Sequence, residues 1–140
     1  MSNQSDAQRD EQNSAWVRQQ FQKANQHLAE KGILPDTVAV SESRYLPPLM
    51  AVWKMKAQDR KEYWVISGDL PTDHMALSAA KDAREAVRAF SLHWQLKAQQ
   101  IMDAGGLDKT KVDFANLLVH RAEALYELFE REDLWNKVAV

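Results

Sequence analysis

The stretch MAVWKMKAQDRKEYWVISG, residues 50–68, is the part of the sequence on which the predicted fold depends. Two apolar runs flank the polar segment QDRK, and this pattern is typical of a β-hairpin with a polar tip. With an even loop centred on Asp59 and Arg60, Trp53 and Trp64 fall on the same face of the hairpin, because successive side chains alternate between faces. We predict that this face is the core. It holds Ala51, Trp53, Met55, Trp64 and Ile66, and the mixed face holds Val52, Lys54, Lys56, Tyr63 and Val65.

The N-terminal segment predicts a tail followed by one helix. Residues 1–13 carry mainly charged and amide side chains and too little apolar surface to offset the entropy cost of ordering, so we expect a disordered tail. Ser14 suits a helix N-cap, and apolar residues recur at spacings of three and four as far as Lys31. Gly32 suits the C-terminal cap of this amphipathic helix.

Between this helix and the hairpin, the sequence favours extended structure. The run TVAVSES, residues 37–43, is short and rich in β-branched side chains, which indicates a strand. Two successive prolines follow, and proline cannot donate a hydrogen bond within a central strand. We therefore expect residues 45–48 to be an extended connector or the edge of a sheet.

After the hairpin, two helices are predicted. From Ser78 to Asp103, apolar residues alternate by three and four, as on the buried side of a long helix, and Gly105 and Gly106 end it. The expected buried side holds Ala83, Val87, Phe90, Trp94, Ala98 and Ile101. Thr110 and Asp113 resemble a capping box that opens the last helix, whose inner side holds Phe114, Leu118, Ala122, Leu125 and Phe129.

These elements predict an α+β fold: an N-terminal helix, a two- or three-stranded antiparallel sheet, and two long helices packed on one sheet face. We expect a single domain over residues 14–135 and a C-terminal tail over residues 136–140, since 140 residues suit one domain of ordinary size.

Composition excludes several classes of function. The net charge of -2 argues against nucleic acid as a partner. The chain has no cysteine, which excludes disulfides, thiolate nucleophiles and cysteine-ligated metals. No stretch approaches the ~20 apolar residues of a membrane helix. Residues 1–13 lack the apolar core of a secretory signal, so we expect a cytoplasmic protein without membrane contact.

The junction GDLPTDHM, residues 68–75, allows two interpretations. Asp69, Asp73 and His74 could ligate a divalent metal or act as an acid–base group. Alternatively, Asp69 and Thr72 cap a helix that follows the strand, because capping alone accounts for each residue type. We favour the capping interpretation, and we predict no metal ligands, no catalytic residues and no cofactor.

Two functional hypotheses remain from the residues alone. The leading hypothesis is a non-enzymatic domain that binds a protein partner or itself, and apolar residues outside the assigned core suggest a homodimer: Val52, Val65, Leu92 and Leu96. The alternative is a small-ligand-binding protein or a hydrolase with a polar site at the junction. Its candidate ligand-binding residues are Glu42, Arg44, Asp69, Asp73 and His93.

Three stretches together resemble a known family: SRYLPPLMAVWK from Ser43, YWVISGDLPTD from Tyr63 and FSLHWQLKA from Phe90. They are similar to an uncharacterised bacterial family of about 140 residues, a domain of unknown function. The resemblance covers most of the chain from Trp16 to Trp135. It implies no activity, ligand or site residue.

Overall fold

A computed structural model describes residues 6–135. The chain divides into two compact units, Met1–Ser78 and Ala79–Val140, which are described separately below. The predicted single domain over residues 14–135 therefore stays a prediction, and the predicted tail at 136–140 lies outside the described residues. Within those residues, no helix is both long enough and apolar enough to cross a membrane.

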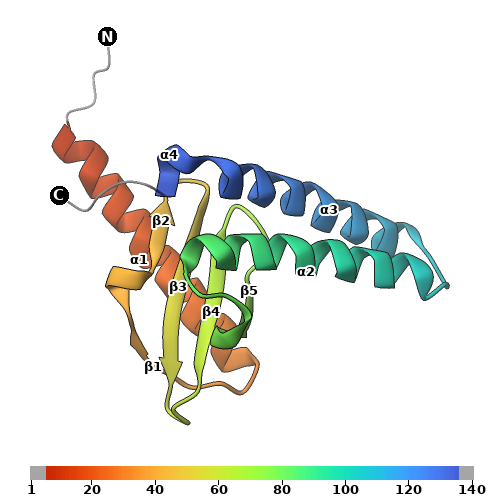
Figure 1. Ribbon diagram of the computed structural model, residues 1–140, viewed down its shortest axis with the longest axis horizontal. Coiled ribbons are helices and arrows are strands. Elements are labelled where there is room, and N and C mark those ends of the chain that lie inside the picture. Colours follow the sequence, from red (N-terminus) through yellow and green to blue (C-terminus); the bar gives the residue numbers. More distant parts are fainter. Residues whose placement is uncertain (1–5, 136–140) are drawn as a thin grey trace. The chain divides into compact units, whose positions relative to one another are not determined.

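The first unit begins with helix α1, Asp6–Glu30 (Figure 1). The helix starts well before Ser14, so the N-cap predicted there is wrong, and only residues 1–5 of the predicted tail lie outside the described residues. The early turns are exposed, and their glutamine, glutamate, arginine and alanine residues form helices readily without packing. Gly32 caps the other end as predicted: with φ at +78°, it allows the N–H of Ile33 to donate to the Leu28 carbonyl at 2.8 Å.

Five antiparallel strands form the sheet of this unit, where the sequence predicts two or three. The strand order is β1-β3-β4-β5, and β2 also pairs with β3. The strands are β1 Pro35–Val38, β2 Arg44–Leu46, β3 Met50–Ala57, β4 Glu62–Gly68 and β5 Asp73–Ala76. The extended segment predicted around Tyr45 is thus a short strand, β2, followed by the two prolines.

The predicted register of the central hairpin is wrong by one residue. The loop is odd and spans residues 58–60, because the N–H of Ala57 donates to the Lys61 carbonyl at 2.9 Å. Arg60 closes this loop in the left-handed conformation, with φ at 71°. Trp53 consequently pairs with Val65, and Trp64 pairs with Lys54. A slip of one residue moves side chains to the other face, so the two tryptophans lie on opposite faces.

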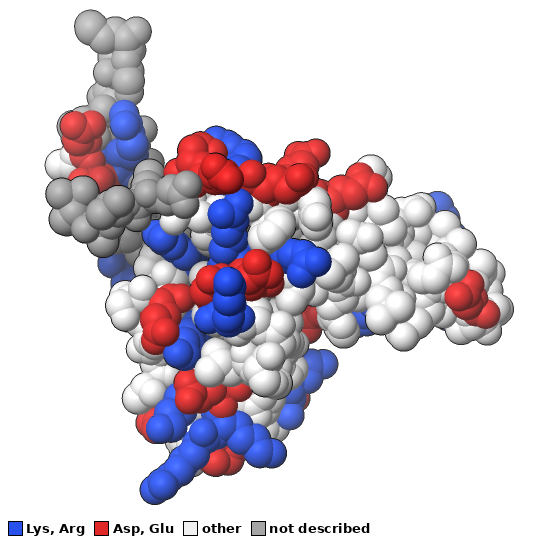
Figure 2. All heavy atoms as spheres, in the orientation of Figure 1, with Lys and Arg blue, Asp and Glu red and all other residues white. Residues whose placement is uncertain are grey.

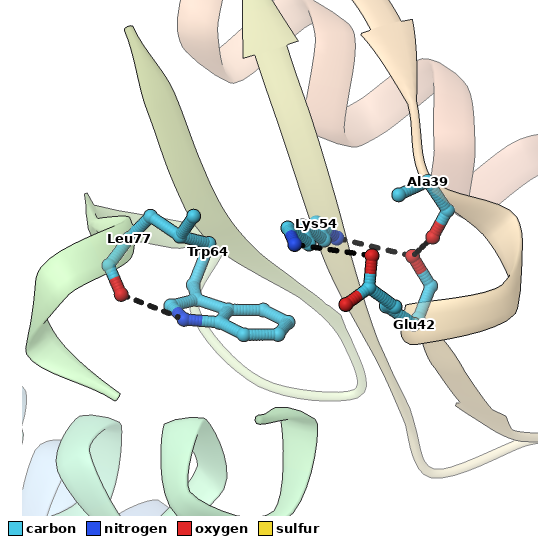
Figure 3. Close-up of polar contacts among 6 residues, drawn as sticks. Ala39, Glu42, Lys54, Trp64 and Leu77 are labelled. Carbon is cyan, nitrogen blue, oxygen red and sulfur yellow. Dashed lines mark hydrogen bonds and ion pairs between the residues drawn. The ribbon is translucent and has the colours of Figure 1, made fainter. Parts of the chain in front are cut away.

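One face of the sheet packs against α1. Its buried cluster combines Ala24 and Leu28 of the helix with sheet residues Ala51, Trp53, Met55 and Val65. The Trp53 ring lies 5.2 Å from the Phe21 ring, and its indole Nε1 donates to Ser67 Oγ at 3.3 Å. On the opposite face, the Trp64 indole Nε1 donates to the Leu77 carbonyl at 3.2 Å (Figure 3).

The junction after β4 leads to another strand rather than to a helix. Residues 69–72 connect β4 to β5, so the prediction that Asp69 caps a helix is wrong. Gly68, with φ at +141°, ends β4, and a Cβ atom there would lie 2.5 Å from the Leu49 carbonyl oxygen. The long helix begins only at Ala83, where the Asp82 carboxylate accepts from the N–H of Glu85 at 2.8 Å.

The second unit is a helical hairpin. Helices α2, Ala83–Asp103, and α3, Lys109–Glu130, run side by side, and the short helix α4, Glu132–Trp135, follows (Figure 1). Ser91 Oγ donates to the Ala122 carbonyl at 2.7 Å and joins the two long helices. Asp108, rather than the predicted Thr110, is the N-cap of α3.

The predicted buried sides of these helices are largely confirmed. Buried residues include Val87, Phe90, Trp94 and Ala98 of α2 and Leu118, Ala122 and Leu125 of α3. Phe114, predicted on the inner side, is 39% exposed. The α+β fold is therefore confirmed, with an N-terminal helix, an antiparallel sheet and two long helices that pack together. The placement of these helices on a sheet face stays a prediction.

The left-handed Arg60 gives a test of the register. We expect Arg60→Gly to raise the free energy of unfolding by about 0.5–1 kcal/mol, because glycine adopts positive φ without steric cost. Lys61→Gly is the matched control and should lower the free energy, since Arg60 is the only non-glycine residue with positive φ within residues 6–135. Urea unfolding measures both. A loss of stability in Arg60→Gly equal to that of the control would contradict the odd loop.

Candidate functional site

The first unit holds a cluster of three titratable side chains, those of His27, Asp73 and His74. His27 Nε2 lies 2.9 Å from His74 Nδ1, a hydrogen-bonding distance, and the ring centroids are 5.0 Å apart with an interplanar angle of 60°. One nitrogen from each histidine and one carboxylate oxygen of Asp73 all lie within 4.8 Å of one another. All three residues are half-buried.

The packing of α1 on the sheet creates this cluster. His27 lies near the C-terminal end of α1, between the fully buried Ala24 and Leu28, which fix that turn against the sheet. His74 is paired with Val65 across β4 and β5, so it shares the face that packs against the helix. The Tyr63 ring, 5.8 Å from the His74 ring, packs beside it on the same face.

Asp73 is the first residue of β5, and its carboxylate binds the backbone of the next residue. Oδ1 accepts the N–H of His74 at 2.8 Å, which holds the carboxylate next to the imidazole pair. This local hydrogen bond is the kind that an aspartate makes at the start of an extended segment. The result is one negative charge beside two imidazole rings.

Burial and neighbouring charges favour the neutral imidazoles. Desolvation lowers the pKa of His27, and the nearby His74 lowers it further, against a smaller opposing effect of Asp73. Desolvation also lowers the pKa of His74, which Asp73 again opposes and Lys31 reinforces. A hydrogen bond between two ring nitrogens needs one neutral acceptor, so the contact itself agrees with this direction.

The five predicted ligand-binding residues are spread over several elements. Arg44, Val52, Ile66 and Asp73 form one row across β2, β3, β4 and β5, which separates Arg44 from Asp73 by about 14 Å. Glu42 accepts from Lys54 Nζ at 3.0 Å on the exposed surface (Figure 3).

Asp69 is exposed, and its backbone N–H donates to the Leu49 carbonyl. His93 is exposed and belongs to the second unit, which is described separately from the other four residues. Asp73 alone among the five is a member of the histidine cluster. The ligand role of the five residues as a set stays a prediction.

Sequence reasoning missed His27. The partners His27 and His74 are 47 residues apart, and neither lies in a metal-binding motif. The available signal was the position of His27 three residues after Ala24 and next to Leu28, on the apolar side of the helix. Because β5 was interpreted as the start of a helix, His74 could not be placed on the face toward α1.

A second feature is the exposed apolar surface of the α2–α3 hairpin, which we call the hairpin surface. It consists of exposed apolar residues that lie on more than one side of the two helices and on their connecting loop: Leu92, Leu96, Met102, Leu107, Phe114, Leu117 and Val119. Figure 2 shows few charged side chains over the part of this hairpin that lies toward the loop between α2 and α3. Leu92 and Leu96 are thus surplus apolar residues as predicted, whereas Val52 and Val65 are fully buried and cannot contribute to an outer surface.

The histidine pair predicts a loss of stability in mild acid. The folded-state pKa values lie below the ordinary value of 6.5, so below that pH the unfolded chain binds more protons and unfolding becomes easier. The free energy of unfolding should therefore fall between about pH 7 and about pH 5.5, above the main titration range of carboxylates. The double variant His27→Gln/His74→Gln should lose less over the same range in urea unfolding with chelator present. An equal loss in both proteins would contradict this origin.

Comparison with known proteins places the chain in a family without assigning an activity. No curated protein matches it, and no solved structure matches it. A family model described as domain of unknown function (DUF4826) matches residues 10–135, which include all five strands and most of every helix. The chain therefore belongs to the DUF4826 family, a domain of unknown function.

Proposed function

We propose that this protein is a non-enzymatic interaction domain that self-associates through the hairpin surface. The observation that carries the proposal is the concentration of exposed, large apolar side chains on α2 and α3. Leu96 is 58% exposed and Leu92 is 46% exposed. Apolar patches of this kind mark sites of protein association, since each leucine removed from water contributes about 1.5–3 kcal/mol.

Helix α2 has apolar residues on two opposite sides. Trp94 and Ala98 are buried, and Leu92 and Leu96, one turn apart, lie on the other side of the helix and are exposed. A helix that packs through one face ordinarily carries charged or polar side chains on the other. The second apolar side of α2 is therefore available for a contact that residues 6–135 do not make.

A second copy of the chain is the occupant that suits this surface. Among aspartate, glutamate, lysine and arginine, residues 89–107 carry only Lys97 and Asp103, and residues 114–120 carry none. So little charge offers nothing to select a charged partner such as nucleic acid or a basic peptide. A two-fold contact between copies places the same apolar patch of each chain against the other. Each leucine position therefore contributes two buried side chains to the interface, one from each copy.

The alternative, a ligand-binding or hydrolytic protein with a site at the β4–β5 junction, is supported by the cluster of His27, Asp73 and His74. None of the three clustered side chains is a serine, threonine or lysine that could act as a nucleophile, and we rank this function second. The cytoplasmic location and bacterial source expected from the sequence stay predictions.

Leu96→Glu tests self-association. Sedimentation equilibrium should give the wild-type chain a concentration-dependent mass that approaches twice the 16.1 kDa monomer, and Leu96→Glu should remain a monomer. The matched control is Leu34→Glu, because Leu34 is equally exposed, at 57%, but belongs to the first unit. This control should dimerise like the wild type.

Other outcomes would reject the proposal. A wild-type monomer at about 0.5 mM would mean that no dimer of useful affinity forms. Loss of the dimer in both variants, or in neither, would mean that the hairpin surface is not the interface. If the monomeric wild-type chain instead binds a different protein through Leu96, the surface is an interaction site but self-association is wrong.

A further inference from the structure

We propose that His27, Asp73 and His74 form a binding site for a divalent transition-metal ion of the Zn²⁺ class. Two imidazole nitrogens and one carboxylate oxygen are a ligand set that suits zinc and its first-row neighbours, with the remaining coordination positions left to water. Within residues 6–135, this is the group of histidine and acidic side chains close enough together to hold an ion.

The distance between the two histidines suits a shared ion. With metal–nitrogen distances of about 2.0–2.1 Å, two ligands at right angles lie about 2.9 Å apart, and two at the tetrahedral angle lie about 3.3 Å apart. His27 Nε2 and His74 Nδ1 lie 2.9 Å apart. The nitrogens therefore need to separate by a few tenths of an ångström at most.

The metal would take the place of one shared proton. In the metal-free protein, one ring nitrogen donates its hydrogen to the other, so only one of the two facing nitrogens has its lone pair free of hydrogen. If the donating ring moves that proton to its other nitrogen, both facing lone pairs become ligands and both rings remain neutral. Burial, which keeps the rings neutral, favours the form that binds metal.

The scaffold holds two of the ligands on different elements. His27 is fixed between Ala24 and Leu28, which are both fully buried, and His74 is paired with Val65 in the sheet. Strand β5 is a short strand at the end of the sheet, paired only with β4. A bound ion would therefore join α1 directly to this strand and stabilise the first unit.

The charges around the cluster are mixed. Asp73 supplies the negative charge, Glu30 lies near His27, and the Lys31 ammonium lies near enough to both rings to lower their pKa values. Lys31 would also repel a bound cation. Its removal should therefore tighten metal binding, an effect that a merely structural histidine pair would not produce.

The experiment uses the full chain without a polyhistidine tag, stripped of metal with chelator. Competition with a chromophoric zinc indicator should give one Zn²⁺ per chain, and Mg²⁺ in excess should not displace it, because imidazole is a poor ligand for that ion. His27→Gln and His74→Gln should each weaken Zn²⁺ binding by at least ~10-fold, and Asp73→Asn should weaken it less. Lys31→Gln should tighten it by ~2- to 5-fold.

His120→Ala is the matched control, because His120 is an exposed histidine of α3, and it should bind Zn²⁺ as the wild type does. Circular dichroism verifies that each variant is folded. The measurements are repeated in Leu96→Glu, so that an ion held between copies is separated from one held within a chain. The metal-binding result can therefore be interpreted even if the chain does not self-associate.

Several outcomes would overturn the site. They are the absence of stoichiometric Zn²⁺ binding at about 100 µM protein, binding that survives both His27→Gln and His74→Gln, and binding that His120→Ala removes. Equal affinity for Mg²⁺ and Zn²⁺ would reject imidazole as the ligand. A rise in the wild-type melting temperature with Zn²⁺, absent in His74→Gln, would support a site that ties β5 to α1.

Discussion

The left-handed turn at Arg60 is the constraint on which the first unit depends. It makes the hairpin loop odd, and the odd loop pairs Trp53 with Val65. Those two residues then share the face against α1, where they join Leu28 in the buried cluster. Because Val65 is also paired with His74, the same register turns His74 toward the helix. A slip of one residue between β3 and β4 would place Trp53 and His74 on opposite faces and would separate the histidine pair from the core.

The histidine pair has a cost that its geometry only partly offsets. Two half-buried imidazoles lose hydration, and the lowered pKa values of His27 and His74 reflect that loss. One hydrogen bond between the rings satisfies one nitrogen of each. An aliphatic pair at the same positions would pack without this cost. Buried groups with shifted pKa values are often found at binding sites, which is consistent with a ligand role for the cluster.

The sequence predicted the elements with strong local signals. The buried side of α2, the Gly32 cap and the existence of the hairpin all follow from periodicity and turn chemistry, which act over a few residues. The register prediction failed because the left-handed position carries arginine, a residue type that gives no local signal of a positive φ. Strand β5 was not predicted because Asp69, Pro71 and Thr72 also suit the start of a helix. The contact of His27 with His74 depends on both and could not be inferred locally.

The two units of the chain differ in how they place their apolar residues. Hydrophobic residues make up 45% of the sequence, an ordinary value, yet the two units use theirs differently. On the sheet, the large apolar residues of β3 and β4 are nearly all buried, and the exposed positions are lysine and glutamate. On the hairpin, Leu92, Leu96 and Leu117 remain exposed after α2 and α3 have packed together. Leu34 and Val40 of the first unit are exposed as well, but most of the exposed large apolar residues within residues 6–135 lie on the hairpin, which supports the proposed self-association.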